Sequence, residues 1–423
     1  MFCSRLIANI ANRQNVSTSI ESLNSIRRQL SVSLENEKLI LIQQDDGKKF
    51  KFPTVWLRDN CQCSECFHDQ TKSRQINWLG SNLNVRVKKI YTLTSACSIT
   101  IDWNDKHIST FDLKWLKERD FSSENHDRYI EEVYKPAAQL WCKDDFQKVC
   151  KTFEFNEVLK NDKALLAWLE AIAIQGFALI RNAPSDTSVV RHLAERIGYI
   201  KRTTYGEEFS VKSKLDAQNY AYLMKPLPLH TDMPYFEYKA GINILHYLVQ
   251  SNSMGGANIM TDGFNIANIM RQKQPEYFDI LKSVPVDWYD MGKDGEMSFH
   301  NIWRAPVVCL DVDGRLHRIN HNTTKRDSHF TVPLEQVQLW YEAYDHFLKL
   351  INDEAIEFKV DAGNVLTFNN LRMLHGRTPY EDSPKNQRYL VGAYVDWDII
   401  YSKIRILRNV KKKQDLYYVH TEG

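Results

Sequence analysis

The chain has 423 residues, of which 43% are hydrophobic and 26% carry a charged side chain, and its formal net charge is +2. A length above ~300 residues exceeds what one hydrophobic core usually serves, so we expect one large domain and a smaller companion. The nearly neutral charge excludes a strongly basic nucleic-acid-binding protein, and the lack of any apolar run near ~20 residues predicts no membrane span, so neither kind of partner is expected.

The first 35 residues read as a leader that lies outside the fold. Residues 1–33 contain four arginines and repeated serines but a single acid, Glu21. An Arg-rich, Ser-rich and acid-poor composition is typical of a mitochondrial transit peptide, so we expect a location in the mitochondrial matrix. The alternative is a disordered tail that carries no targeting signal, which would leave the protein in the cytoplasm.

Residues 36–135 are expected to form a small β-rich domain. Val85–Tyr91 and Ser98–Trp103 alternate apolar and polar residues over short lengths, which is typical of strands with one buried face. The same region contains the densest group of cysteines in the chain. These are Cys61, Cys63 and Cys66.

Three thiolates this close together would suit zinc, which takes four nitrogen or sulfur ligands in a closed structural site. Eight cysteines are too sparse for a disulfide scaffold in a chain of this length, so the cluster indicates a metal and a reducing compartment. The fourth ligand is open between two histidines: His68 is nearest in sequence, and His107 follows the strand expected to end near Trp103. The alternative is a group of thiols that binds no metal.

Residues 140–410 are expected to form the large domain. Apolar residues at helical spacing predict a helix over Asp162–Ile174, followed by the strand Phe177–Ile180 and a second helix over Asp186–Gly198. Further strands are predicted at Ile242–Leu248, Ala257–Phe264, Val307–Val312, Ile356–Val360, Asn364–Phe368 and Tyr389–Val395.

Two long helical stretches, Ile266–Val284 and Pro333–Asp353, interrupt these strands. Many short strands with inserted helices predict a mostly β fold of the jelly-roll type. Near the end of the chain, Asp396–Lys413 is expected to pack on the outside as a helix, and residues 411–423 are expected to be a solvated tail.

A histidine and a carboxylate lie two residues apart at His230 and Asp232, just before Pro234. A proline biases the residue before it toward extended backbone, and alternate side chains of an extended segment share one face. The two side chains can therefore point at one spot. A third ligand, His375, lies far downstream, and two imidazoles with one carboxylate form the facial triad of non-heme Fe(II) oxygenases.

Five stretches in this order resemble one family of enzymes. They are Trp56–Cys66, His230–Pro234, Thr261–Phe264, Leu374–Arg377 and Gly392–Asp398. The similarity runs from about Glu37 to Arg408, and it identifies the chain as a member of the gamma-butyrobetaine hydroxylase and trimethyllysine dioxygenase family of 2-oxoglutarate- and Fe(II)-dependent oxygenases. The family fold is a double-stranded β-helix, or jelly roll, with a small N-terminal zinc domain, and its members are usually homodimers.

The resemblance implies a set of cofactors and their ligands. In the family, the positions matching His230, Asp232 and His375 hold Fe(II), and ascorbate keeps that iron ferrous. The position matching Arg388 grips the distal carboxylate of 2-oxoglutarate, which a guanidinium can do in bidentate fashion, and Leu245 matches a residue of the same pocket. A structural zinc ion is implied for the cysteine cluster.

The resemblance also implies a trimethylammonium substrate. A quaternary ammonium is recognised largely by aromatic faces, and three tyrosines match the family's aromatic cage. The predicted substrate contacts are Tyr205, Tyr222, Tyr394 and Phe209 at the cation, and Asn219 and Asn320 at the carboxylate. Phe209 stands where the family usually has Trp, and this departure puts the affinity for the substrate, or its identity, in doubt.

The implied reaction is the hydroxylation of γ-butyrobetaine to L-carnitine. The alternative is trimethyllysine dioxygenase activity, which the transit-like leader favours because that enzyme is the one usually found in mitochondria. The local sequence match favours γ-butyrobetaine. A remote alternative is a zinc-module binding protein that has lost catalysis, although no residue of the triad is missing.

Overall fold

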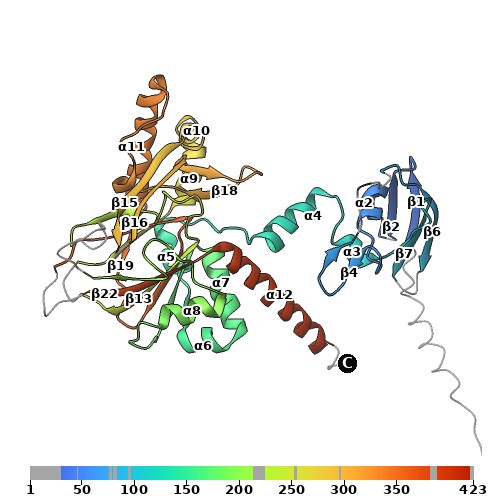
Figure 1. The fold of residues 1–423 in the computed structure, drawn as a ribbon, viewed down its shortest axis with the longest axis horizontal. Coiled ribbons are helices and arrows are strands. Elements are labelled where there is room, and N and C mark those ends of the chain that lie inside the picture. The colour runs from blue at the N-terminus through green and yellow to red at the C-terminus, as the bar shows by residue number, and fades with distance from the viewer. Residues whose placement is uncertain are drawn as a thin grey trace, which may run out of the picture. The chain divides into compact units, whose positions relative to one another are not determined.

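The computed structural model describes residues 30–44, 46–75, 79, 83–93, 97–212, 224–251, 255–294, 297–381 and 388–419. The chain divides into two compact units, Met1–Ile130 and Glu131–Gly423 (Figure 1). Most of the expected leader lies outside the described residues. Its last six residues form the first strand of a sheet, so the fold begins earlier than the boundary predicted at residue 35.

The first unit is built from short strands and helices. Its strands are β1 (Leu30–Glu35), β2 (Leu39–Gln44), β3 (Lys49–Pro53), β4 (Phe67–His68), β5 (Ser73–Arg74), β6 (Val87–Leu93), β7 (Ser98–Trp103) and β8 (Ile108–Asp112). Its helices are α2 (Thr54–Asp59), α3 (Leu113–Lys117) and α4 (Ser123–Arg128), and a π-helical turn, η2 (Tyr129–Tyr134), follows α4.

Two antiparallel three-stranded sheets, β1-β2-β3 and β6-β7-β8, enclose the core of this unit. Residues of β7 alternate between half-buried and buried, as its sequence pattern predicts, and Trp103 is fully buried. The described residues of this unit are therefore rich in strands, as the alternation in the sequence predicts.

The second unit contains the remaining elements. Its strands are β9 (Thr152–Glu154), β10 (Phe177–Arg181), β11 (Glu208–Val211), β12 (Leu227–His230), β13 (Ile242–Val249), β14 (Asn258–Asp262), β15 (Val286–Asp294), β16 (Met297–Ala305), β17 (Val308–Leu310), β18 (Leu316–Ile319), β19 (Ile356–Phe358), β20 (Val365–Asn369), β21 (Met373–Arg377) and β22 (Tyr389–Val395). Its helices are α5 (Phe146–Val149), α6 (Phe155–Lys160), α7 (Asp162–Ile174), α8 (Val189–Ile197), α9 (Gly263–Lys273), α10 (Pro275–Ser283), α11 (Val337–Asp353) and α12 (Trp397–Val419), with short 3-10 turns η3 (Lys143–Asp145), η5 (Thr323–Lys325) and η6 (Leu334–Gln336).

Two sheets form the centre of this unit. One has six strands in the order β11-β22-β13-β20-β10-β9, and the other has four in the order β12-β21-β14-β19. A buried apolar cluster contains residues from both sheets, among them Phe368 and Leu390 from the first and Met260 and Met373 from the second. Two sheets packed over a common core, with strands that are not consecutive in sequence as neighbours, are the jelly-roll arrangement that the sequence predicts.

Helices cover the outer face of the six-stranded sheet. Ile242 and Ile244 of β13 pack with α6, α7, α8 and α12 in one large cluster (Figure 1). Because β13 is covered on both faces, six of its eight residues are hydrophobic, and Asn243 and His246 are the exceptions. The expected outer helix is present as α12, whose Ile400, Ile404 and Leu407 are buried against this cluster.

Several element boundaries differ from the predictions; α12, for example, continues to Val419, through most of the residues expected to be a tail. Two of the differences have a clear physical cause. The helix expected over Ile266–Val284 is two helices, because Pro275 lacks an N–H and the residue before it, Gln274, is pushed out of helical geometry. The strand expected to end at Phe264 ends at Asp262, whose side chain accepts hydrogen bonds from the first backbone N–H groups of α9.

A long antiparallel hairpin, β15–β16, was not predicted. Three aspartates lie among the nine residues of β15, and aspartate is depleted in strands, so the strand propensity of this sequence is low. This hairpin and the shorter hairpin β17–β18 pack with α9, α10 and α11 around a second large apolar cluster. Across the described part of the chain, no helix has the length and apolar character needed to cross a membrane.

Candidate metal centres and active-site cavity

A cavity of ≈ 130 Å³ lies between the two sheets of the second unit. One wall is the inner face of the six-stranded sheet. Its lining residues follow the two-residue period of strands, so that Ile242 and Ile244 face the helices while their neighbours face the cavity. The lining residues of this wall are Asn243, Leu245 and Tyr247 on β13, Leu390 and Tyr394 on β22, and Phe209 and Val211 on β11.

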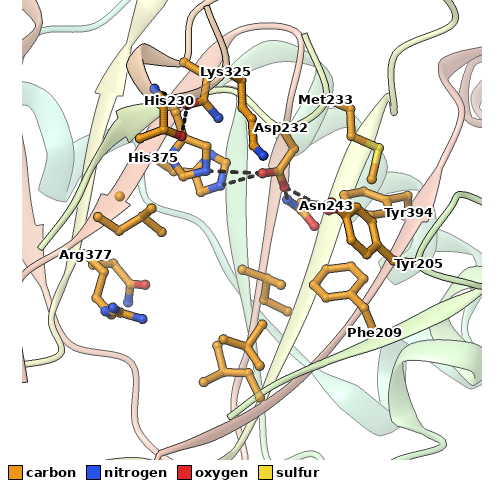
Figure 2. Close-up of a pocket in the computed structure, with 18 of the residues that line it drawn as sticks. Tyr205, Phe209, His230, Asp232, Met233, Asn243, Lys325, His375, Arg377 and Tyr394 are labelled. Atoms are coloured by element: carbon orange, nitrogen blue, oxygen red, sulfur yellow. Dashed lines mark hydrogen bonds and ion pairs between the residues drawn. The ribbon is translucent and has the colours of Figure 1, made fainter. Parts of the chain in front are cut away.

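The opposite wall carries two histidines on adjacent strands. His230 of β12 lies directly across from His375 of β21 in the antiparallel register. Side chains of such pairs lie on the same face, and the two imidazole ring centroids are 4.3 Å apart. The sheet therefore brings together two residues that are far apart in sequence (Figure 2).

Asp232 completes the group. Its Oδ1 atom lies 3.2 Å from Nε2 of His230 and 3.7 Å from Nε2 of His375. The ligand atoms of the three residues all lie within 4.8 Å of one another, a spacing that could hold a metal ion. The structure thus places together the three residues that the sequence predicts as a facial triad.

The backbone of Asp232 is fixed by a buried asparagine that sequence reasoning missed. The side chain of Asn370 accepts a hydrogen bond from the N–H of Asp232 (2.8 Å) and donates one to its carbonyl (3.0 Å). The next residue, Met233, has a φ of 56°, in the left-handed region that non-glycine residues rarely adopt. Strain of this kind persists where the surroundings hold it, and it is common at functional sites.

The carboxylate of Asp232 uses its two oxygens differently. Oδ1 faces the imidazoles, while Oδ2 accepts hydrogen bonds from the amide of Asn243 (2.6 Å) and the hydroxyl of Tyr394 (3.0 Å) (Figure 2). Burial alone would raise the pKa of Asp232, but the imidazoles of His375 and His230 and the bond from Asn243 hold that pKa well below its usual value. The carboxylate is therefore anionic at neutral pH.

Both histidines are set up to present a lone pair. Nδ1 of His230 lies 2.9 Å from the carbonyl oxygen of Pro228, a contact that requires its proton on Nδ1 and leaves Nε2 free to bind a cation. Burial, together with the neighbouring His230, lowers the pKa of His375 to about 3, so that its ring is neutral. Two imidazoles and one carboxylate with open positions around them are the donor set that Fe(II) takes in oxygenases.

Two arginines line the cavity beyond the histidines. Arg388 is buried, its Nε atom has no hydrogen-bond partner, and no carboxylate of the described residues pairs with it. Burial, and then the nearby charge of Arg388, lowers the pKa of Arg377 to about 10. Two guanidiniums held this close in a buried place form a site for an anion. Leu245, predicted to line the same pocket, does line the cavity.

Aromatic rings of three predicted substrate contacts lie at the other side of the cavity. Phe209 stacks on Tyr394 with ring centroids 4.9 Å apart, and Tyr205 lies near them (Figure 2). The hydroxyl of Tyr205 donates to the buried carboxylate of Asp290 at 2.7 Å. The far end of the Phe209 ring lies against Gly392, where a Cβ would come within 2.2 Å of the ring.

Three predicted substrate residues are not seen at the cavity. Asn219 and Tyr222 lie outside the described residues. Asn320 is buried but does not line the cavity, and its amide donates to the carbonyl oxygen of Pro306 at 3.0 Å.

Sequence reasoning missed several lining residues. Asn243 was detectable in principle, because an asparagine in an otherwise apolar strand must find a buried partner. Lys325, which lies 2.5 Å from Asp290, carried no such signal, because it comes from the irregular segment around η5.

A second group of possible metal ligands lies in the first unit. Nε2 of His107 is 3.3 Å from the sulfur of Cys61 and 3.5 Å from the sulfurs of Cys63 and Cys66. The other candidate, His68, is not part of the group, and its ring contacts Thr71 instead. The structure therefore brings His107 to the three thiols.

The chemistry of this group fits zinc. Burial raises the pKa of the Cys66 thiol to about 12, in spite of the nearby guanidinium of Arg58. Three thiolates could share such a place only with a cation among them, and three sulfurs with one imidazole nitrogen form a closed tetrahedral donor set.

Comparisons with known proteins agree on one family. The model of the "Taurine catabolism dioxygenase TauD, TfdA family" matches residues 134–394, and that of "Gamma-butyrobetaine hydroxylase-like, N-terminal" matches residues 32–117. The chain is 35% identical to human gamma-butyrobetaine dioxygenase over 382 residues, which is 90% of this chain and 97% of that protein. It is 29% identical to a gamma-butyrobetaine dioxygenase of Pseudomonas sp. (strain AK-1), covering 86% of this chain and 92% of that protein.

Trimethyllysine dioxygenases are also similar to the chain. The mitochondrial enzyme of Bos taurus is 29% identical, covering 84% of this chain and 83% of that protein. Among solved structures, an asparagine oxygenase in complex with Fe(II), hydroxyasparagine and succinate matches with a TM-score of 0.43 at 14% identity, covering 59% of this chain and 93% of that chain.

Proposed function

The chain belongs to the TauD, TfdA family of dioxygenases and, within it, to the gamma-butyrobetaine dioxygenase family, and on this premise we propose that it hydroxylates γ-butyrobetaine to L-carnitine. The reaction consumes O₂ and 2-oxoglutarate and releases succinate and CO₂. One observation carries the proposal. A single cavity brings together a possible metal triad, stacked aromatic rings and a buried arginine that has no carboxylate partner among the described residues.

His230, Asp232 and His375 would hold Fe(II), because the donor set fits that ion and leaves positions open for other ligands. When iron and the 2-oxo acid are bound, they supply with O₂ the oxidant that inserts one oxygen atom into a C–H bond. Ascorbate would keep the iron ferrous between turnovers.

Arg388 would bind the distal carboxylate of 2-oxoglutarate. Its buried position and its Nε atom, which has no hydrogen-bond partner among the described residues, support this role, since a buried guanidinium is stabilised by an anion. Arg377 adds a second positive charge, and Leu245 provides an apolar wall.

The aromatic rings would receive the trimethylammonium group. A quaternary ammonium donates no conventional hydrogen bond, so aromatic faces can bind it without a polar partner. Tyr205, Phe209 and Tyr394 offer such faces, and Tyr222 is proposed to join them. Asn219 is proposed to contact the carboxylate of the substrate, whereas Asn320, predicted for the same role, does not line the cavity and is not assigned to it. With both ends of a short linear molecule held, its distance from the triad would select the carbon that is oxidised.

Trimethyllysine is the second candidate substrate, supported by the similarity to trimethyllysine dioxygenases. It carries the same trimethylammonium group but adds an α-amino group and length. The higher identity to human gamma-butyrobetaine dioxygenase over nearly the whole chain favours γ-butyrobetaine.

We further propose a structural zinc ion at Cys61, Cys63, Cys66 and His107, a mitochondrial location and a homodimer. The mitochondrial location rests on the composition of residues 1–33 and on the mitochondrial trimethyllysine dioxygenases among the relatives. Fractionation of cells that express the full chain tests the location, and light scattering of the purified protein tests the dimer.

The experiment for the main proposal is an assay with Fe(II), 2-oxoglutarate and ascorbate, assembled without oxygen and started by adding it. γ-Butyrobetaine and trimethyllysine are offered in parallel, and succinate is followed together with the mass of each substrate. We expect γ-butyrobetaine to gain one oxygen atom and His230→Ala to abolish the reaction. Arg388→Lys should raise the KM for 2-oxoglutarate more than the KM for γ-butyrobetaine, because a lysine cannot form the bidentate contact.

Hydroxylation of trimethyllysine alone would keep the family and overturn the substrate. Succinate without any hydroxylated product would mean that neither molecule is the substrate. A protein that binds no iron and forms no succinate would instead support the binding protein without catalysis.

A further inference from the structure

The second oxygen of Asp232 is held by two donors that reach it from the opposite wall of the cavity. Asn243 donates to Oδ2 at 2.6 Å and Tyr394 donates to the same oxygen at 3.0 Å. Both contacts cross from the six-stranded sheet to the loop that follows β12 in the four-stranded sheet. A carboxylate oxygen accepts about two hydrogen bonds at its lone pairs, so Oδ2 is fully occupied.

The sheet register explains why these two donors meet at one atom. Asn243 of β13 and Tyr394 of β22 lie directly opposite each other in an antiparallel pair. Residues paired in this way project from the same face, here the face that lines the cavity. Neither side chain is placed by a flexible loop, so the two bonds have a fixed geometry relative to the sheet.

Tyr394 therefore has two separate chemical parts. Its ring stacks on Phe209 within the proposed substrate cage, whereas its hydroxyl binds the carboxylate of the proposed metal triad. The tyrosine across the cage, Tyr205, is built differently, because its hydroxyl donates to Asp290, which is no member of the triad.

We propose that Asn243 and the hydroxyl of Tyr394 are positioning residues for the metal ligand Asp232. By occupying Oδ2, they leave Oδ1 as the one oxygen that faces the metal beside the two imidazoles, so that the carboxylate binds through one oxygen and leaves the other coordination positions open. This inference rests on the metal site of the proposed function. Partners that orient a ligand in this way typically contribute about 10- to 100-fold to metal affinity.

The test is Mn(II) binding to the full chain, followed by the electron paramagnetic resonance signal of the free ion. Mn(II) prefers oxygen ligands such as carboxylates to thiolates, so we expect it to bind the site of Asp232 and not the thiols of the first unit. Tyr394→Phe keeps the ring and removes the hydroxyl, and we expect its Kd for Mn(II) to rise about 10-fold or more. Asn243→Ala should act in the same direction, and the spectrum of bound Mn(II) should change in both variants because the second oxygen is released.

Tyr205→Phe is the matched control, because it removes a cage hydroxyl that does not touch Asp232. It should bind Mn(II) as the wild type does. Thermal unfolding of each variant shows whether it is folded. If Asn243→Ala is unstable, Tyr394→Phe alone tests the proposal, because it preserves the stacked ring.

Wild-type affinity and an unchanged Mn(II) spectrum in Tyr394→Phe would overturn the inference while leaving the metal site intact. An equal loss of affinity in Tyr205→Phe would also overturn it, because the effect would not pass through Asp232. A wild-type protein that binds no Mn(II) would reject the metal site itself, and with it the proposed function.

Discussion

Phe209 owes its position in the cage to a glycine. Its ring lies on Gly392, where any side chain would collide with it, and it stacks on Tyr394. A tryptophan at this position would present a larger aromatic face with a stronger attraction for a cation. We therefore expect Phe209→Trp to lower the KM for γ-butyrobetaine about two- to fivefold, an effect of about 0.5–1 kcal/mol.

The control for this prediction is an uncharged isostere of γ-butyrobetaine in which carbon replaces the nitrogen. Its inhibition constant should change much less than the KM for the cation, because it gains packing but no cation–π attraction. An equal gain for both molecules would show that ring size, and not charge, limits the affinity.

His321 is a buried histidine whose charge is linked to stability. Its Nδ1 lies 3.1 Å from the hydroxyl of Tyr344, and burial, together with the nearby His230, lowers its pKa to about 3. In the unfolded chain His321 binds a proton below pH ~6.5, whereas in the folded chain it stays neutral until the pH nears 3. The free energy of unfolding is therefore highest above pH ~6.5 and falls as the pH drops from there toward 3, because the proton favours the unfolded chain.

His321→Gln should remove part of this pH dependence. Between pH 7 and pH 5.5 the wild type is expected to lose about 1 kcal/mol more of its free energy of unfolding than the variant does. Urea unfolding at the two pH values measures the difference. Parallel losses in the two proteins would mean that the folded state also takes up the proton in this range.

At the scale of elements, one buried ion pair joins three segments of the large unit. The guanidinium of Arg372 forms two bonds to the carboxylate of Asp262 (2.9 and 2.7 Å) and also donates to the carbonyl of Ile174 at the end of α7. Asp262 in turn caps α9. Both charged side chains are fully buried, so neither can find water if its partner is removed.

We expect Arg372→Met to reduce the free energy of unfolding by about 3–5 kcal/mol, because it leaves the carboxylate of Asp262 buried without its cation. Denaturant unfolding measures the loss. Lys349→Met, which removes an exposed ion pair with Asp345 on α11, should leave the unfolding midpoint unchanged. A small loss in Arg372→Met would indicate that water reaches Asp262.

The metal triad could be predicted because its signal is local. His230 and Asp232 stand two residues apart in sequence, and the five ordered motifs supply His375. The extended geometry expected before Pro234 was wrong, because β12 ends at His230 and Met233 has a φ of 56°. Most elements were also visible as local patterns; α7 matches its prediction residue for residue, and β7 does so in the first unit. The fold class followed from the same patterns.

The supporting residues could not be predicted, because their roles depend on pairing between distant strands. Asn243 reaches Asp232 from β13, and Asn370 reaches it from just after the end of β20, which pairs with β13, so both depend on strand pairing and on the approach of the two sheets. Likewise, the choice of His107 over His68 depends on the turn between β7 and β8, which no spacing rule gives. The local sequence shows which side chains have suitable chemistry, whereas strand pairing and sheet packing determine which of them come into contact.

At the scale of the whole molecule, the first unit offers a zinc test that is independent of catalysis. Cys63→Ser should reduce the zinc content from about one ion per chain to near zero, because three ligands hold a structural ion far less tightly than four. The near-ultraviolet circular dichroism should weaken, since Trp56, Trp103 and Trp115 pack in the core of this unit.

Cys97→Ser is the matched control, because Cys97 belongs to the same unit but is exposed and lies outside the cluster. Elemental analysis should find its zinc content unchanged. Retention of zinc by Cys63→Ser would show that the ion, if present, is bound elsewhere.

The two sheets of the large unit divide the chemistry between them. The histidines and Asp232 come from the four-stranded sheet and its following loop, whereas Phe209 and Leu245 come from the six-stranded sheet. Substitutions confined to cavity-facing positions of β11 and β22 would therefore change which substrate is bound and leave the three metal ligands unchanged. Tyr394 is the exception, because its ring lies in the cage and its hydroxyl binds the metal ligand Asp232. A substitution there would change substrate specificity and reactivity together.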